Sequence, residues 1–78
     1  MHKHLWESKK KDIKRILDKE GIIINFRLPY FRFGKNLLQK QEKHGYGKIP
    51  QEEIQLLLEK HIKMGLDEKV LKQIIYLQ

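Results

Sequence analysis

Residues 22–28 alternate between two sets of side chains, and this period of two is typical of a half-buried β-strand. The set expected to face inward is Ile22, Ile24, Phe26 and Leu28. The set expected to face outward is Ile23, Asn25 and Arg27. Pro29 would end the strand because it lacks a backbone N–H. One strand cannot form a sheet alone, so the sequence predicts antiparallel pairing of two chains in a homodimer.

The segments on either side of this stretch have the three-to-four-residue apolar period of amphipathic helices. Before it, Ser8 is expected to cap a helix that runs to about Lys19. After it, residues 50–77 are expected to form a helical hairpin, with Pro50 in the first turn of one helix and Asp67 as the N-cap of the other. The predicted fold class is therefore mainly α with one short β-strand, in a small helical domain that ends in a helical hairpin.

Residues 30–44 are compatible with two structures. Apolar residues spaced three or four apart predict a helix, although Gly34 weakens it by about 1 kcal/mol relative to Ala. The alternative is that this segment is the second arm of a β-hairpin. That hairpin would place Arg27 opposite Arg32, and like charges directly opposite each other are destabilising. We therefore prefer the helix and keep the hairpin as the alternative.

Length and composition narrow the class of protein. Residues 1–78 form a single domain, and a domain this small has a thin core that dimerisation would supplement. The chain has no cysteine, which excludes disulfides and Cys-based zinc sites. No apolar run is long enough to cross a membrane, and the N-terminus lacks the apolar core of a secretory signal. We expect a cytoplasmic protein with no membrane partner.

Positive charge is concentrated in the first part of the chain. The whole chain has a net charge of +7, with 13 bases and 5 acids in residues 1–48 but 4 bases and 5 acids in residues 49–78. We expect the first part to face nucleic acid, because positive potential attracts polyanions, and the second part to serve as core or dimerisation unit. Double-stranded DNA is the preferred partner, and RNA stays open as an alternative.

The sequence gives little basis for catalysis or for a metal site. The four histidines do not show the helical i, i+4 spacing with a carboxylate partner that recognisable metal sites use. Ser8 is the single serine, and a helix cap explains it better than a nucleophile does. We therefore expect a protein that is not an enzyme and that binds no cofactor and no metal.

Three consecutive segments resemble the ribbon-helix-helix DNA-binding proteins, namely INFRLP, YFRFGKNLLQKQEKHG and IPQEEIQLLLEKHI. They match the strand and the two helices of that family over about residues 22–62. The resemblance implies a dimer whose ribbon enters the major groove, with base edges contacted by Asn25, Arg27 and Ile23. It also implies that backbone N–H groups near Pro50 hold a phosphate. Ile23 departs from the family, in which a polar residue is usual at that position.

Two other families show partial resemblances. The segments YFRFGKNLLQK and GKIPQEEIQLLLEKH are similar to the recognition helix and the following helix of winged-helix excisionases, although Pro29 interrupts the helix that should come first. This likeness implies groove contacts from Lys35, Asn36, Gln39 and Lys40. The segment IQLLLEKHIKMGLDEKVLKQII is similar to the dimerisation module of the Sin repressor and antirepressor family, which implies an oligomer or partner surface in the hairpin.

Two further sets of functional residues follow from the charge and the resemblances. Phosphate contacts are expected from Lys9, Lys10, Lys11, Lys14, Arg15, Arg32, Lys35, Lys40 and Lys48. A dimer or partner interface is expected from Phe26, Leu28, Leu57, Leu58, Leu71 and Ile74. The expected function is that of a small DNA-binding regulator of transcription or of a related DNA transaction, binding the major groove as a dimer. The alternative is an inhibitor, antirepressor or adaptor that binds a protein through the helical hairpin or through the aromatic residues Tyr30, Phe31 and Phe33.

Overall fold

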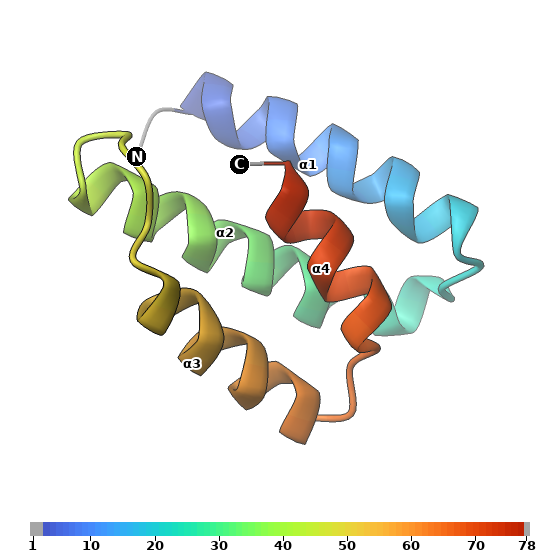
Figure 1. Ribbon diagram of the computed structural model, residues 1–78. Coiled ribbons are helices and arrows are strands. Elements are labelled where there is room, and N and C mark those ends of the chain that lie inside the picture. The colour runs from blue at the N-terminus through green and yellow to red at the C-terminus, as the bar shows by residue number, and fades with distance from the viewer. Residues whose placement is uncertain (1–2, 78) are drawn as a thin grey trace.

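The structure is a computed structural model that describes residues 3–77 and contains four α-helices and one short 3-10 helix (Figure 1). The α-helices are α1 (Lys3–Lys19), α2 (Arg27–Lys43), α3 (Gln51–Lys63) and α4 (Glu68–Tyr76), and the 3-10 helix is η1 (Ile24–Phe26). No β-strand occurs within residues 3–77. The predicted fold class, with its strand and ribbon-helix-helix-like architecture, is therefore wrong, because the protein is a small all-helical domain.

Helix α2 is the centre of the fold and packs against each of the other three α-helices. In Figure 1, α1 and α3 lie on opposite sides of α2, and α4 crosses one face of this layer. Within the described residues α1 and α3 do not contact each other. The molecule is flat, with principal extents of 33 × 27 × 16 Å. The face of α2 that α4 does not cover is consequently open to solvent.

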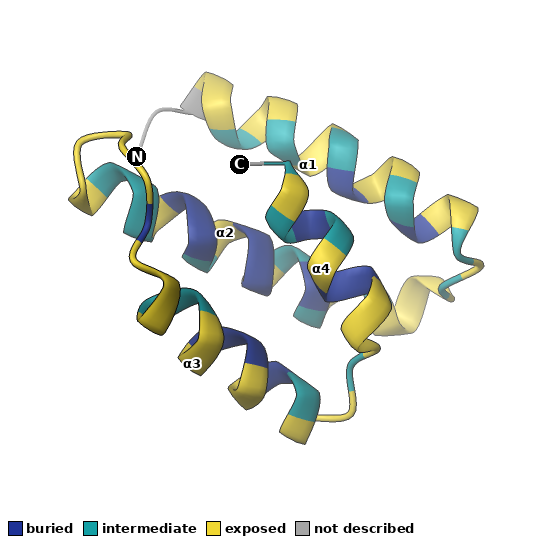
Figure 2. Ribbon diagram, viewed as in Figure 1, coloured by how far each residue is buried: buried dark blue, intermediate teal, exposed yellow. Residues whose placement is uncertain are grey.

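The hydrophobic core lies where the four helices face one another (Figure 2). Its most deeply buried apolar side chains are Ile13, Leu17, Phe33, Leu37, Leu38, Val70, Leu71 and Ile74. Each such side chain contributes about 1.5–3 kcal/mol relative to an exposed one. Four residues expected at a dimer or partner interface, namely Leu57, Leu58, Leu71 and Ile74, are buried in this core. Of that predicted set, Phe26 and Leu28 are exposed.

The segment predicted as a strand instead forms a linker, a 3-10 turn and the start of α2. Ile22 and Ile23 are not in a helix, Ile24–Phe26 form η1, and α2 begins at Arg27. A lone strand would leave its backbone N–H and C=O groups without partners in this chain, whereas the helical turn pairs some of them locally. Pro29 does not end an element, because it lies in the first turn of α2, where its missing N–H costs no intrahelical hydrogen bond. The helix predicted for residues 30–44 is confirmed and the hairpin alternative is wrong.

Helix α1 begins earlier than its predicted cap. Ser8 was expected to start the helix, but α1 already includes Lys3, so Ser8 lies in its middle and is exposed. Trp6, in the first turns of α1, is partly buried against the core. Because most helical stability in proteins comes from packing of an apolar face, burial of Trp6 explains why the helix extends past the predicted cap.

The turn between α3 and α4 is stabilised by a glycine with positive φ, by an N-cap and by a hydrogen bond to α2. Gly65 has a φ of +96°, a conformation that glycine adopts without strain. The Asp67 carboxylate accepts a hydrogen bond from the Lys69 backbone N–H at 2.9 Å, as expected for an N-cap. The Asp67 backbone N–H donates to the Tyr30 hydroxyl at 2.9 Å. The predicted cap is thus confirmed, and it is also anchored to α2. Pro50 immediately precedes α3 rather than lying inside it.

Gly34 permits the close approach of α1 and α2. A Cβ at this position would overlap the Cδ1 atom of Ile13 and lie 3.7 Å from the Cγ2 atom of Ile74. The glycine that weakens the sequence-based prediction of a helix therefore suits the packing, since a side chain at this position would force the end of the Ile13 side chain to move.

Candidate nucleic-acid interface

The open side of α2 carries a row of basic and amide side chains. They are spaced at i, i+3, i+4, i+7 and i+11, which places them on one side of a helix. The row consists of Arg32, Lys35, Asn36, Gln39 and Lys43, and we call it the α2 basic face. Asn36 is half-buried and the other four are exposed. No acidic residue occurs between Gly21 and Gln41, so an anion that approaches this face meets little repulsion from carboxylates.

A shallow groove continues the α2 basic face toward α3. It has a volume of about 330 Å³ and is lined by Asn36, Gln39, Lys40, Lys43, Leu57 and Lys60. None of these lining residues is acidic. Lys60 was missed by the sequence analysis because it lies in the part of the chain expected to be core or dimerisation unit. Only the packing of α3 against α2 brings Lys60 to the same groove as Lys40 and Lys43.

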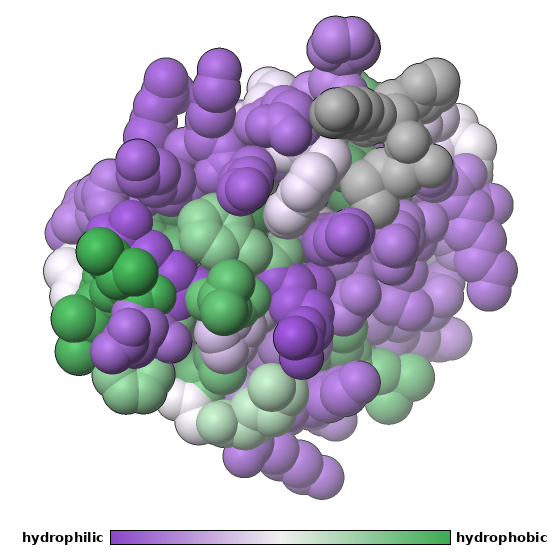
Figure 3. All heavy atoms as spheres, turned by 180° about the vertical axis from the view of Figure 1, so that it is seen from behind, coloured by the Kyte–Doolittle hydropathy of each residue, from purple (hydrophilic) through white to green (hydrophobic). Residues whose placement is uncertain are grey.

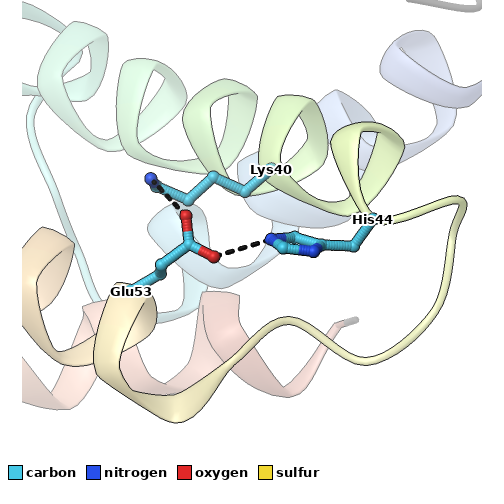
Figure 4. A network of polar contacts seen from close by, with 3 residues as sticks. All are labelled: Lys40, His44 and Glu53. Carbon is cyan, nitrogen blue, oxygen red and sulfur yellow. Dashed lines mark hydrogen bonds and ion pairs between the residues drawn. The ribbon is translucent and has the colours of Figure 1, made fainter.

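Glu53 joins the end of α2 to the start of α3 at one edge of this groove (Figure 4). One carboxylate oxygen, Oε2, lies 2.6 Å from Nε2 of His44. The other, Oε1, accepts from Nζ of Lys40 at 3.5 Å. The hydrogen bond with His44 is the largest cause that lowers the pKa of Glu53; desolvation opposes it, and the electrostatic effect of His44 and Lys40 lowers the pKa further. The contact holds α3 in place beside α2, and it leaves Lys40 less free than Lys43 to bind a phosphate.

The depressed pKa of Glu53 predicts a loss of stability in acid. In the unfolded chain the carboxyl group titrates near its ordinary pKa of 4.5, whereas in the folded protein it titrates at a lower pH. The ionised Glu53 carboxylate therefore stabilises the folded protein above pH 4.5, and this stabilisation is lost as pH falls through the pKa of Glu53 in the folded protein. We expect Glu53→Gln to unfold more easily than wild type in urea at neutral pH, and this difference to shrink in acid.

Glu52→Gln is the matched control for this measurement. Glu52 lies in the same turn of α3, is exposed, and has no ion pair within the described residues. Its replacement is expected to leave the urea midpoint and its pH dependence close to those of wild type. A difference between Glu53→Gln and wild type that stays constant from neutral to acidic pH would contradict the role assigned to the carboxylate.

The cations expected to bind phosphate on α1 are mostly exposed. Lys10, Lys11 and Lys14 face solvent, and Arg15 lies 3.5 Å from the Asp12 carboxylate. Lys9 differs, because it is half-buried and its Nζ donates to the Leu77 backbone carbonyl at the end of α4. Lys48, also expected to contact phosphate, lies exposed in the loop before α3.

The three residues expected to read bases do not form a reading surface. The ribbon that should present Ile23, Asn25 and Arg27 is absent. The Arg27 guanidinium contacts the Asp18 carboxylate and donates to the Ile22 backbone carbonyl at 3.4 Å, so it is held against α1. Asn25 and Ile23 are exposed on and beside η1.

The aromatic surface proposed for a protein partner is largely absent. Tyr30 and Phe33 are buried, and Phe31 is half-buried. The hairpin residues expected to bind a protein partner, Leu57, Leu58, Leu71 and Ile74, are buried in the core. The exposed face of α2 is therefore the best-formed candidate site among the surfaces that the sequence predicted.

No family model matches the sequence, and neither a curated protein nor a solved structure matches it. Across residues 3–77, no helix is both long enough and apolar enough to span a membrane. The same part of the chain has no group of three or more His, Asp or Glu side chains that could hold a metal ion.

Proposed function

We propose that this protein binds double-stranded DNA through the α2 basic face and acts as a small regulator of transcription or of a related DNA transaction in the cytoplasm. The observation that carries the proposal is the row of cations and amides along one side of α2, four of whose five side chains are exposed. The single acid between its two ends, Arg32 and Lys43, is Glu42. Lys and Arg bind phosphates and release counterions, and Asn and Gln pair with base edges.

The order of side chains along the α2 basic face suits a helix lying across the major groove. Arg32 and Lys43 are the two ends of the row, and they are separated by about 16 Å along the helix axis at 1.5 Å per residue. The major groove of B-DNA is about 12 Å wide. The two cations can therefore reach phosphates on either side of the groove, while Asn36 and Gln39 lie between them, over the base edges.

Lys60 and the groove between α2 and α3 extend the contact surface. A phosphate next to Lys43 would also meet Lys60 across the groove. The nearest carboxylate at its edge is that of Glu53, which is paired with Lys40 and His44. The opposite side of the molecule differs, because α4 covers it and two cations on α4 are paired there. Lys69 lies 3.7 Å from the Glu20 carboxylate, and Lys72 lies 3.0 Å from the Glu68 carboxylate.

The salt dependence of DNA affinity tests the proposal. On a random duplex, the logarithm of the wild-type association constant is expected to fall linearly with the logarithm of salt concentration. Arg32→Ala combined with Lys43→Ala removes two phosphate contacts, so the slope is expected to become shallower by about 1.8, at 0.9 per phosphate. Fluorescence anisotropy of a labelled duplex at a series of salt concentrations measures both slopes.

Lys69→Ala combined with Lys72→Ala is the matched control, because it also removes two positive charges but from the exposed side of α4, away from the α2 basic face. Its slope is expected to equal that of wild type. If the salt slope became shallower by the same amount in both double variants, net charge alone, and not the α2 basic face, would determine binding. Absence of wild-type binding to duplex DNA at low salt would overturn the proposed function.

The two amides provide a separate test of sequence preference. Asn36→Ala and Gln39→Ala are each expected to leave the salt slope unchanged. Wild type is first used to select duplexes from a random pool. Each variant is then expected to bind these duplexes in preference to random ones by about 1–3 kcal/mol less than wild type does, the usual value of one good base contact. A preference unchanged in both variants would restrict the site to phosphate binding.

A further inference from the structure

The linker and η1 expose an unusual number of large apolar side chains. Ile23, Ile24, Phe26 and Leu28 are 64%, 75%, 60% and 70% exposed, although they lie within six consecutive residues. We call these four residues the η1 patch. Viewed from behind in Figure 3, hydrophobic side chains gather at one edge of a largely hydrophilic surface. Contiguous exposed apolar surface of this kind is typical of an interaction site.

An open apolar groove adjoins the η1 patch. It has a volume of about 340 Å³, and its lining contains no charged residue. The lining consists of Gly21, Ile22, Ile23, Phe26, Pro29, Tyr30, Met64, Gly65 and Leu66. Ile23 and Phe26 belong both to the patch and to the wall of the groove. One edge of the molecule therefore offers projecting apolar side chains and a recess that can receive them.

We infer that this edge binds a second copy of the same chain. A two-fold arrangement places the η1 patch of each copy against the groove of the other, because both features lie on the same edge. Ile24 and Phe26 of one copy then enter the groove between η1 and the turn that joins α3 to α4 in its partner. Such an interface supplies the apolar burial that a domain of this size lacks on its own.

The charge around the η1 patch favours a second copy over an anionic partner. Residues 18–28 contain two acids and two bases, and residues 63–69 also contain two acids and two bases. The segments that frame the patch and groove are therefore neutral, whereas the whole chain carries +7. Two copies can meet here without the repulsion that their net charge causes elsewhere, because the rim is neutral and Asp18 and Glu20 are paired with Arg27 and Lys69 within each chain. An anionic lipid surface or an acidic peptide would find no net positive charge at this edge.

Sedimentation equilibrium in buffer without DNA tests the inference, and its result is separate from the proposed function. With rising concentration, wild type is expected to approach twice the mass of one chain. Ile24→Glu places a carboxylate in the patch and is expected to stay at the mass of one chain, a twofold difference. Leu56→Glu is the matched control, since Leu56 is 67% exposed on α3, outside the patch and groove.

A second variant separates loss of dimerisation from misfolding, because Ile24→Glu could lower the mass by disturbing the fold. Phe26→Ser removes apolar surface without adding charge and is also expected to reduce the mass twofold, with the helical circular dichroism of wild type retained. Wild type that keeps the mass of one chain at its highest soluble concentration would overturn the inference. The inference would also be overturned if both patch variants kept the dimer mass of wild type. The same holds if Leu56→Glu lowered the mass as much as the patch variants do. Monomeric wild type that co-sediments with phosphatidylserine vesicles, and loses this binding in Ile24→Glu, would assign the patch to a lipid surface instead.

Discussion

Phe33→Ala is expected to lower the free energy of unfolding by about 3–5 kcal/mol, the usual cost of truncating a buried aromatic side chain. Phe33 is fully buried in the central helix, and its ring meets the ring of His61 edge to face at a centroid distance of 4.9 Å. At about 0.05–0.15 kcal/mol per residue, a domain of this length has roughly 4–12 kcal/mol of stability in total. The substitution therefore removes a large fraction of it.

Urea unfolding followed by circular dichroism measures this loss. Phe33→Leu keeps most of the apolar volume and is expected to cost clearly less than Phe33→Ala. Phe31→Ala, two residues away on the same helix, removes a half-buried ring and is also expected to cost less. Similar midpoints for Phe33→Ala and Phe31→Ala would contradict the placement of Phe33 at the centre of the core.

Gly34→Leu is expected to destabilise the protein by about 1–3 kcal/mol through overpacking, although leucine is the better helix former. The reason is the contact between α1 and α2, where even a Cβ at position 34 would overlap Ile13. An exposed glycine in a helix would behave oppositely, since its replacement would stabilise the helix by up to about 1 kcal/mol. The sign of the change therefore reports directly on how closely α1 approaches α2.

A double-mutant cycle identifies the contact responsible. Ile13→Val removes the Cδ1 methyl group and alone is expected to cost about 0.5–1.5 kcal/mol. Combined with Gly34→Ala, it makes room for the new methyl group, so the double variant is expected to be more stable than the sum of the single changes by at least about 0.5 kcal/mol. Strict additivity in urea unfolding would show that the two positions do not touch.

The helical hairpin was predictable because its signals are local. The N-cap function of Asp67 and the apolar period of residues 50–77 depend on neighbours within one or two turns. The η1 segment was not predictable in the same way, because an alternation over seven residues does not distinguish a strand from a linker that leads into a 3-10 turn. Of the set predicted to face inward, Ile22 packs partly against the core. Ile24, Phe26 and Leu28 are exposed in the single chain, so the prediction was wrong for these three residues.

The candidate site was predictable only in part. The likeness to winged-helix excisionases predicts groove contacts from Lys35, Asn36 and Gln39. All three lie on the α2 basic face, and the period of the helix alone is enough to place them on one side of it. The binding of Lys40 to Glu53 depends on how α3 packs against α2. The position of Lys60 depends on the same packing, and no local pattern in the sequence encodes it.

The absence of contact between α1 and α3 has a consequence for how the protein opens. Either helix can separate from α2 without first displacing the other, because within the described residues they share no surface. Local opening of the outer helices would then expose their backbone amides to exchange with solvent deuterium while those of α2 remain protected. The helix that carries the basic face would thus exchange more slowly than the two helices on either side of it.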